Sequence, residues 1–348
     1  MKLENEIKLD FKDVLFRPKR STLSSRNEVQ VEREFKFKHS GRSWTGVPII
    51  SSNMDTISSV EMYKELSKKK FLTCFHKYIN INDIIKACQQ GFDSQYFMLS
   101  TGITDKDFVN IQSQVELLKK NNIETHFICI DVANGYMFRL LDFCKKMRSR
   151  FPNITLIAGN VVTREIVEEL IINGCVDIIK VGIGSGAVCT TRLQTGVGMP
   201  QFSAVLECSD AAHGLNAMII SDGGICYPGD VGKAFGGGAD FVMVGSMLAG
   251  HTECPGDMIE ENGKQYKLFY GMSSDTAMNK HHGGVASYRS SEGKTVKVPF
   301  KGPVENTLNN ILGGVRSTCT YIGASRLKDI NKCATFMRVN NIVNNYYS

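Results

Sequence analysis

The chain has 348 residues, with 41 Lys and Arg against 35 Asp and Glu, so its formal net charge is +6. Hydrophobic residues make up 42%, which supports a sizeable core and excludes an intrinsically disordered chain. No window approaches the ~18 consecutive apolar residues of a membrane span. The positive charges form short scattered clusters, so neither a membrane nor a nucleic acid is an expected partner.

The N-terminus alternates charges and lacks the apolar stretch of a secretory signal. Eleven cysteines, an odd number without a C-x-x-C pair, argue against a disulfide framework or a structural zinc site. We therefore expect reduced thiols and a cytoplasmic protein. The adjacent His281 and His282 have no Cys or carboxylate spaced to complete a metal site, so we do not expect metal catalysis.

Short apolar runs bounded by turn residues predict strands along most of the chain. These runs span 47–52, 71–75, 95–100, 126–131, 154–158, 176–181, 217–221 and 239–244. Helical spacing between them is clearest at 105–120, 136–150, 164–172 and 201–212. Because eight strands that alternate with helical stretches are typical of a (β/α)₈ TIM barrel, we predict an α/β barrel and treat residues 1–348 as a single domain. An open doubly wound sheet is the alternative.

Three segments lie outside this alternation. Residues 1–46 are polar and predict an N-terminal lid or hairpin. Residues 251–303 form a long insertion after the eighth strand, without clear periodicity, and such loops are usually functional lids or disordered. Beyond Val304, helical spacing returns.

Glycine-rich turns follow the last two predicted strands, at 221–224 and at Gly245-Ser246. In a barrel, catalytic groups lie at the C-terminal ends of strands, and phosphate sites favour the loops after strands seven and eight. Glycine lets backbone N–H groups approach an anion closely, so a phosphorylated ligand is one interpretation. Tight βα turns that need glycine for their backbone shape are the other.

A further glycine-rich loop, 182–192, follows the sixth predicted strand and contains Cys189. The loop satisfies G-x-G-x-x-A, but no helix follows at once, so the dinucleotide fingerprint is weak. Two hydroxyls and Arg192 lie near Cys189 in the sequence, and a nearby cation favours the thiolate that a cysteine nucleophile needs. An inert buried cysteine is the alternative. The carbonyls of such a loop can also turn inward and hold a monovalent cation.

Polar residues at other predicted strand ends are candidates for the same rim. Asp131 ends the fourth strand, and Asn53 and Asp55 follow the first; each either binds a hydroxyl-rich ligand or caps a helix. In the late insertion, Glu292 lies among an aromatic, a cation and hydroxyls. If this loop folds over the rim, Glu292 can polarise the hydroxyl of Thr191 for proton transfer.

Together these motifs resemble the GMP reductase family, which is similar in barrel and nucleophile to IMP dehydrogenase. The matching segments are 11–15, 53–56, 131–135, 188–192, 221–224, 270–274, 292–295 and 317–321. The dehydrogenases usually carry a regulatory domain inserted between early barrel strands, and the short spacing between the second and third predicted strands leaves no room for it. The segment 292–295 also resembles the reductase form.

The resemblance implies an oxidoreductase of purine metabolism that converts GMP to IMP and ammonia with NADPH as hydride donor. Cys189 would attack carbon 2 of the purine to give a covalent thioimidate, while Thr191 and Glu292 relay the proton that lets ammonia leave. Two alternatives stay open: an IMP dehydrogenase without its regulatory insertion, and a catalytically silent nucleotide-binding protein.

The resemblance also implies which residues bind each ligand, and that the protein is a homotetramer. GMP would contact Asp222, Gly223, Gly224, Gly245, Ser246, Gly271, Met272, Ser273, Arg289, Ser290, Ser291 and Gly293. NADPH would contact Ser25, Arg26, Lys77, Asp131, Val132, Ala133, Ile183, Gly184, Met272, Tyr288, Arg289, Ser317, Thr318, Cys319 and Thr320. A potassium ion would lie on Gly184, Gly186 and Cys189, near Arg192.

One loop departs from the family pattern. Where the family commonly has Gly-Pro-Gly-Ser, this chain has Gly184-Ser185-Gly186-Ala187. The hydroxyl that would touch the phosphate is therefore missing at Ala187, and Ser185 lacks the fixed φ of proline. Ser185 is the candidate to compensate.

Overall fold

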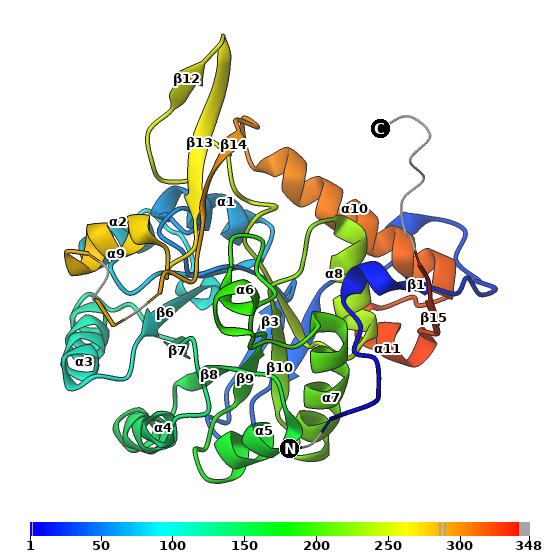
Figure 1. The fold of residues 1–348 in the computed structure, drawn as a ribbon, viewed down its shortest axis with the longest axis horizontal. Coiled ribbons are helices and arrows are strands. Elements are labelled where there is room, and N and C mark those ends of the chain that lie inside the picture. Colours follow the sequence, from blue (N-terminus) through cyan, green and yellow to red (C-terminus); the bar gives the residue numbers. More distant parts are fainter. Residues whose placement is uncertain (2, 285–286, 289, 341–348) are drawn as a thin grey trace.

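The computed structural model describes residues 1, 3–284, 287–288 and 290–340. Its centre is a closed parallel barrel of eight strands in the order β10-β11-β4-β5-β6-β7-β8-β9 (Figure 1). The barrel strands are β4 (Ile49–Ser51), β5 (Leu72–Cys74), β6 (Phe97–Thr101), β7 (Phe127–Asp131), β8 (Thr155–Val161), β9 (Ile178–Val181), β10 (Met218–Asp222) and β11 (Phe241–Val244). Each overlaps one predicted run, so the barrel is confirmed. The open sheet is wrong, because β11 pairs with β4 and closes the ring.

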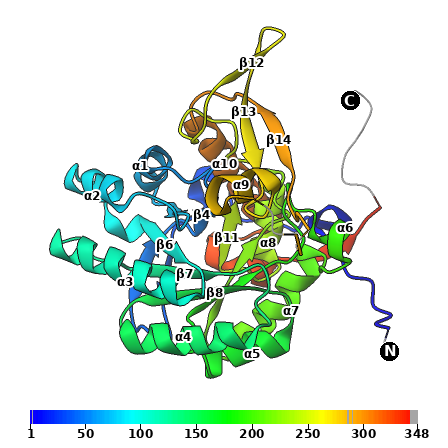
Figure 2. The same cartoon turned by 60° about the vertical axis from the view of Figure 1, so that its left-hand side comes forward.

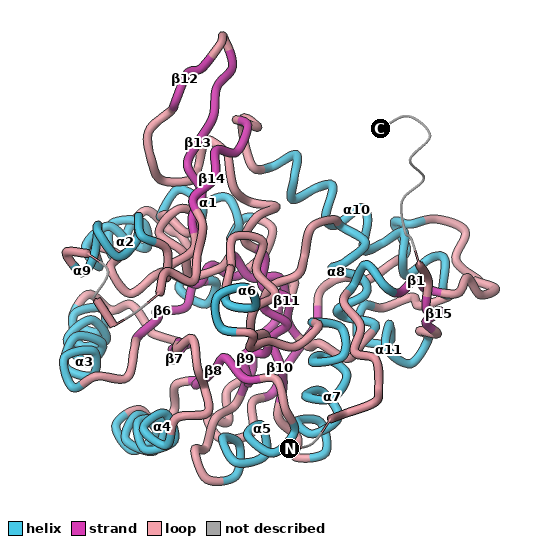
Figure 3. The backbone as a smooth tube through the Cα atoms, in the orientation of Figure 1, coloured by secondary structure: helices cyan, strands magenta, loops and turns pink. Residues whose placement is uncertain are grey.

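Helices surround the barrel (Figure 3). They are α1 (Val60–Lys68), α2 (Ile81–Gln89), α3 (Asp105–Lys120), α4 (Phe138–Arg150), α5 (Arg164–Ile172), α6 (Thr191–Thr195), α7 (Gln201–Gly214), α8 (Pro228–Gly236), α9 (Asp275–His282), α10 (Glu305–Ile322) and α11 (Ile330–Cys333). Local chemistry sets their ends: α3 begins at a capping box in which Thr104 and Asp107 bond each other's backbone N–H, and α10 ends at Gly323 with φ +78°. None of the helices in the described ranges is long and apolar enough to cross a membrane.

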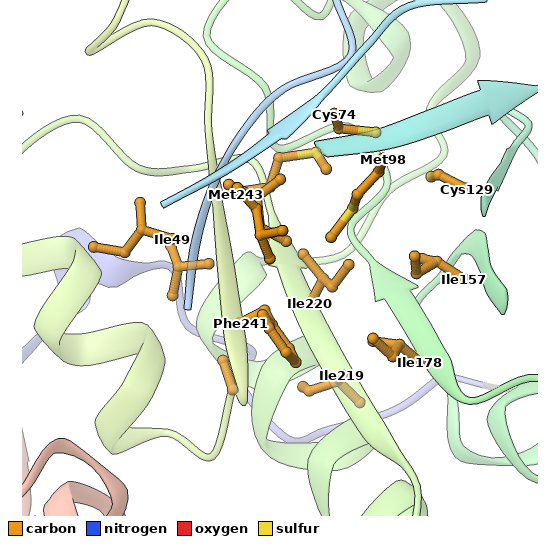
Figure 4. Packing of buried hydrophobic residues seen from close by; sticks show 14 of the residues in the cluster. Ile49, Cys74, Met98, Cys129, Ile157, Ile178, Ile219, Ile220, Phe241 and Met243 are labelled. Carbon is orange, nitrogen blue, oxygen red and sulfur yellow. The ribbon is translucent and has the colours of Figure 1, made fainter. Parts of the chain in front are cut away.

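Aliphatic and sulfur-containing side chains fill the barrel. Met98 of β6, Cys129 of β7, Ile220 of β10 and Met243 of β11 are all at most 1% exposed and belong to one continuous core cluster (Figure 4). Such near-continuous apolar strands are typical of a parallel sheet covered by helices. The core therefore holds the strands in place and fixes where their C-terminal ends lie.

A hairpin in the N-terminal segment closes the end of the barrel at which the strands begin. Strands β2 (Arg33–Lys36) and β3 (Ser43–Gly46) form an antiparallel hairpin. Its Phe35 stacks on Phe241 at 4.5 Å and its Trp44 lies 6.3 Å from Phe127, between ring centroids. Phe241 and Phe127 are the first residues of their strands, so the hairpin packs under the N-terminal ends. The predicted hairpin is confirmed for 33–46, and this part of the segment does not form a lid over the rim.

Small elements complete the termini. Strand β1 (Val14–Phe16) pairs with β15 (Phe336–Arg338), which joins the two ends of the described chain. The described residues also contain the short 3₁₀ helices η1 (Phe11–Asp13), η2 (Arg26–Glu28), η3 (Ser94–Tyr96) and η4 (Leu327–Asp329).

The insertion after β11 is folded rather than a plain loop. Strands β12 (Ile259–Glu261), β13 (Lys264–Tyr270) and β14 (Thr295–Pro299) form an antiparallel sheet that projects from the barrel, with α9 between β13 and β14 (Figure 2). Asn262 and Gly263 turn the chain at φ +50° and +70°. An Asn-Gly pair between alternating residues is a strong hairpin signal, and it accounts for the arm that periodicity alone does not predict.

Candidate active site

A cavity of about 280 Å³ opens at the C-terminal ends of the barrel strands. Loops after β4, β7, β9, β10 and β11 contribute to its wall, together with Glu292 and the segment that follows β13. This is the end of a barrel at which catalytic groups lie. The cavity is therefore the first candidate for a substrate site.

Three side chains in this cavity form a hydrogen-bonded chain. The thiol of Cys189 donates to Thr191 Oγ1 at 3.2 Å, and the Thr191 hydroxyl donates to Glu292 Oε2 at 2.7 Å. A nucleophile, a hydroxyl relay and a carboxylate are thus within proton-transfer reach of one another. The structure brings together the three residues that were expected to be catalytic, although 101 residues separate Thr191 from Glu292.

Backbone pairing fixes Glu292 above the cysteine loop. Thr190 N–H donates to Glu292 O at 2.9 Å, and Lys294 N–H donates to Val188 O at 2.9 Å. A Cβ at Gly293 would lie 3.0 Å from the backbone N of Ser274, a tight contact that glycine avoids. The insertion therefore delivers its carboxylate on a short stretch of paired backbone, not on a free loop.

A charged network crosses the floor of the cavity. Lys180 of β9 lies 2.8 Å from Asp131 Oδ1 and 2.7 Å from Asp222 Oδ2. Burial would raise the pKa of Asp131, but the charge of Lys180 and hydrogen bonds from Lys180 and Asn53 outweigh it and hold the pKa below its usual value. Motif reasoning missed Lys180 and Asn160 as site residues. A lysine inside an otherwise apolar strand was the signal that could have found Lys180.

The residues expected to bind GMP gather largely around this cavity. Those that line it are Asp222, Gly223, Gly224, Gly245, Ser246, Gly271, Met272 and Ser273. Ser291 and Gly293 lie in the paired segment above it, where Ser291 Oγ donates to Gly293 O at 3.2 Å. Ser290 is exposed, and Arg289 lies outside the described residues.

The loop 184–187, which departs from the family pattern, forms part of the wall of the same cavity. Ser185 Oγ donates to Asp222 O at 3.1 Å, and both Ser185 and Ala187 line the wall. A Cβ at Gly223, which has φ +94°, would lie 2.4 Å from Ser185 Oγ. Ser185 thus packs against the glycine turn expected to hold phosphate, which is where a compensating hydroxyl is needed.

The residues expected to bind NADPH divide into two groups. Asp131, Val132, Ala133, Ile183, Gly184 and Met272 line the first cavity. A second cavity of about 380 Å³ adjoins it and shares Ala133, Ile183, Thr191 and Glu292. Lys77 lies nearby on the loop after β5, 3.4 Å from Asp107, and Tyr288 is 87% exposed. The members of this group that line a cavity therefore lie beside Cys189, Thr191 and Glu292.

The second group lines neither of these cavities. Ser25 and Arg26 lie at η2, which packs against α10, and Ser317, Thr318, Cys319 and Thr320 lie on α10 itself. The hydroxyls of Ser317 and Thr320 donate to carbonyls of their own helix, and Cys319 is fully buried. Within one chain, this group does not join the residues around Cys189.

The residues expected to hold a potassium ion lie in one turn. Gly186 O accepts a hydrogen bond from Cys189 N–H at 3.0 Å, and a Cβ at Gly184 would lie 2.7 Å from Arg192 Cγ. The guanidinium of Arg192 bonds Asp10 and Met199 O and has no lone pair to offer a cation. Only backbone carbonyls of this turn fit such an ion.

Asp55, the other candidate on the first loop, faces away from the reaction site. Its Oδ2 accepts hydrogen bonds from His281 Nε2 at 2.6 Å and Tyr270 at 3.0 Å, and lies 2.9 Å from Lys280 Nζ. Burial would raise the pKa of Asp55, but hydrogen bonds from His281 and Lys280 lower it. Asp55 therefore anchors α9, the helix that precedes the Glu292 segment. Asn53 lines the cavity and donates to Asp131 Oδ2 at 2.8 Å.

Comparison with known proteins agrees with this geometry. Residues 8–344 match the model of the IMP dehydrogenase / GMP reductase domain. A GMP reductase of Klebsiella pneumoniae is 57% identical over 342 residues, which is 97% of each chain. GMP reductases of Escherichia coli O139:H28 and Salmonella typhi are each 56% identical, over 99% and 97% of this chain and 100% and 97% of their own. The chain belongs to the IMP dehydrogenase / GMP reductase family.

Proposed function

We propose that this protein catalyses the NADPH-dependent reductive deamination of GMP to IMP and ammonia. The observation that carries the proposal is the hydrogen-bonded chain of Cys189, Thr191 and Glu292 at the rim of a barrel whose relatives, 56–57% identical over nearly the whole chain, are GMP reductases. The protein is thus an oxidoreductase of purine nucleotide metabolism.

In the first half of the reaction, protons move along the hydrogen bonds between Cys189, Thr191 and Glu292. As the sulfur of Cys189 bonds to carbon 2 of GMP, its proton passes through Thr191 to Glu292. The same carboxyl returns the proton through Thr191 to the departing amino group, which leaves as ammonia. One S–C bond forms, one C–N bond breaks, and a covalent thioimidate remains.

The second half breaks the S–C bond. When bound, NADPH supplies the hydride that carbon 2 accepts. Cys189 is then the leaving group, and the sulfur departs as a thiolate and regains a proton. Asp131, Val132 and Ala133 would hold the nicotinamide end, since all three line the first cavity and Ala133 also lines the adjoining one.

The short chain between two barrel strands supports the proposed direction of the reaction. Only α2 and η3 lie between β5, which ends at Cys74, and β6, which begins at Phe97, so no regulatory domain is inserted there. This supports a reductase over an IMP dehydrogenase. The intact hydrogen-bonded series of Cys189, Thr191 and Glu292 argues against a silent nucleotide-binding protein.

The remaining expectations belong to the same proposal. In a homotetramer, the group at Ser25, Arg26 and 317–320 would serve the cofactor of a neighbouring subunit, which accounts for its distance from the cavities of its own chain. A potassium ion would rest on the carbonyls of Gly184, Gly186 and Cys189 and steady the cysteine loop. Eleven free thiols suit the reducing cytoplasm.

The test is a coupled assay on the purified protein. GMP and NADPH are mixed with it while NADPH oxidation and ammonia release are followed together, and IMP with NAD serves as the parallel reaction. Equal loss of NADPH and gain of ammonia is the expected result. Turnover only in the parallel reaction would replace the reductase with a dehydrogenase, and GMP binding without turnover would indicate a silent binding protein.

A further inference from the structure

Lys180 is a buried charge that the barrel itself does not need. Its side chain is 4% exposed, and its neighbours in β9, Ile178, Ile179 and Val181, are all fully buried and apolar. Burying an ammonium costs free energy unless it is fully paired, and an apolar residue of similar length would fill the same space. A lysine here therefore points to a role beyond packing.

The geometry of Lys180 joins the two expected ligand sites. Its Nζ bonds Asp131 of β7 on the cofactor side and Asp222 of β10 on the substrate side, at 2.8 and 2.7 Å. Asn53 donates to the second oxygen of Asp131, and Asn160 donates to the same Asp222 oxygen that Lys180 holds, both at 2.8 Å. Both carboxylates are thus fixed in orientation.

Two oxygen atoms of this network can accept hydrogen bonds from a ligand. Within the described residues, Asp222 Oδ1 receives no hydrogen bond, and Asp222 lines the cavity, so this oxygen can accept from ribose hydroxyls. The amide oxygen of Asn160 is buried without a partner in the same wall and can accept one more hydrogen bond. Lys180 and Asn160 hold one oxygen of Asp222 and free the other.

Few other charges act on this network. Lys77 also favours the ionised form of Asp131, and the thiols of Cys129 and Cys74 face Lys180 from the barrel interior. Burial would lower the pKa of Lys180, but Asp131 and Asp222 raise it well above its usual value. One persistent positive charge therefore balances two carboxylates.

We propose that Lys180 is a positioning residue that couples the two ligand sites: its ammonium holds Asp222 for the ribose of GMP and Asp131 for the nicotinamide side of NADPH. This rests on the proposed function. Because both carboxylates share one counter-ion, loss of Lys180 weakens GMP binding and NADPH use together, and it makes the ionisation of Asp131 harder.

The decisive variant is Lys180→Met. We expect the Kd of GMP, measured without NADPH, and the KM of NADPH each to rise at least about 10-fold. The acid limb of kcat/KM should move to higher pH, with activity partly recovered in alkali, because Asp131 without its Lys180 counter-ion ionises at higher pH. Lys180→Arg keeps the charge and should retain the wild-type profile.

Lys233→Met is the matched control. Lys233 is also buried, 3.4 Å from Asp230, but on α8 and outside both cavities. It should lower Tm without changing the GMP Kd or the acid limb. A Lys180→Met protein that only loses Tm in the same way overturns the proposal.

A second variant covers failure of Lys180→Met to fold. Asp131→Asn removes one of the two carboxylates that orient the Lys180 ammonium, so Lys180 holds Asp222 less firmly and GMP should bind at least about threefold more weakly even without NADPH. An unchanged GMP Kd there overturns the coupling. Wild-type protein without GMP turnover would instead refute the proposed function, which the binding measurements do not depend on.

Discussion

The two ends of the barrel both carry buried or half-buried carboxylates, but they use them differently. At the closed end, Asp177 accepts four hydrogen bonds from its own chain, from the amides of His39, Ser40 and Leu156 and from Arg148. At the open end, Asp222 keeps one oxygen without a partner in the described chain. A carboxylate saturated by its own fold stabilises it, whereas one with spare capacity can recognise a ligand.

Packing shows the same contrast. Under the barrel, Trp44 lies within 6.3 Å of Phe35, Tyr96, Phe127 and Phe241, between ring centroids. Above it lies a cavity walled by glycine, small side chains and charges. We therefore expect substitutions at the open end to change turnover at constant stability, and substitutions at the closed end to do the reverse.

Cys189→Ala should give the largest effect. Without the sulfur no covalent intermediate forms, so turnover should fall by at least about 10⁴-fold, while GMP binding and Tm stay near wild type. Steady-state ammonia release, GMP titration and thermal unfolding measure the three quantities. Cys88→Ala, on α2, is the control that should keep activity. Substantial remaining turnover in Cys189→Ala would refute covalent catalysis.

Trp44→Ala should give the largest effect at the closed end. Removing a ring that is 3% exposed should lower the free energy of unfolding by about 3–5 kcal/mol, with kcat at 25 °C within about twofold of wild type. Urea unfolding and the coupled assay measure both. Trp44→Phe is the matched control: it keeps an aromatic ring and loses chiefly the hydrogen bond from Nε1 to Gln95 O, and should cost about 1 kcal/mol. A kcat that falls with stability in Trp44→Ala would mean that the two ends are not independent.

The parts of the fold that depend on the periodicity of apolar residues were predictable from the sequence. The apolar runs around 178–181 and 218–222 predicted barrel strands because a parallel strand buried on both faces needs continuous aliphatic residues. The arm at 259–270 was not predicted, since its alternation is short and its signal is a two-residue turn at Asn262-Gly263. Which end of the barrel the N-terminal hairpin covers depends on tertiary packing of Phe35 and Trp44, which local pattern does not encode.

The site was predictable residue by residue but not as a network. Strand-end position singled out Asp131, Asp222 and Cys189, and the aromatic, cationic and hydroxyl neighbours of Glu292 in the late insertion singled out that residue. Lys180 lies inside a strand rather than at its end, so a rule that searches loops passes over it. Asp55 shows the converse: it follows a strand at the correct rim, yet its partners come from β13 and α9, more than 200 residues later.

Glu292→Gln should reduce kcat by about a hundredfold, because the amide cannot carry the proton that Thr191 relays. The backbone bonds of residue 292 to Thr190 and Ser273 remain, so GMP affinity should change little. Single-turnover ammonia release measures the affected half of the reaction. Glu260→Gln, exposed on β12, is the control. A fall below about fivefold would assign the proton to another group.

The smallest effect is a pH dependence confined to the closed end. A hydrogen bond to Asp240, reinforced by its charge, raises the pKa of His213 against the opposing effects of burial and Arg33. Because the folded pKa is higher than the unfolded value of about 6.5, the stabilisation is complete below that pH and is lost as pH rises through the folded pKa. The His213 side chain is 38% exposed, so solvent screening should keep its contribution below about 1 kcal/mol. Urea unfolding of wild type and His213→Gln should therefore show a gap in stability at pH 6 that closes in alkali, with the pH profile of turnover unchanged. A stability difference that stays constant with pH would mean that His213 stabilises the closed end by packing. The contrast between the two ends would then rest on uncharged contacts only.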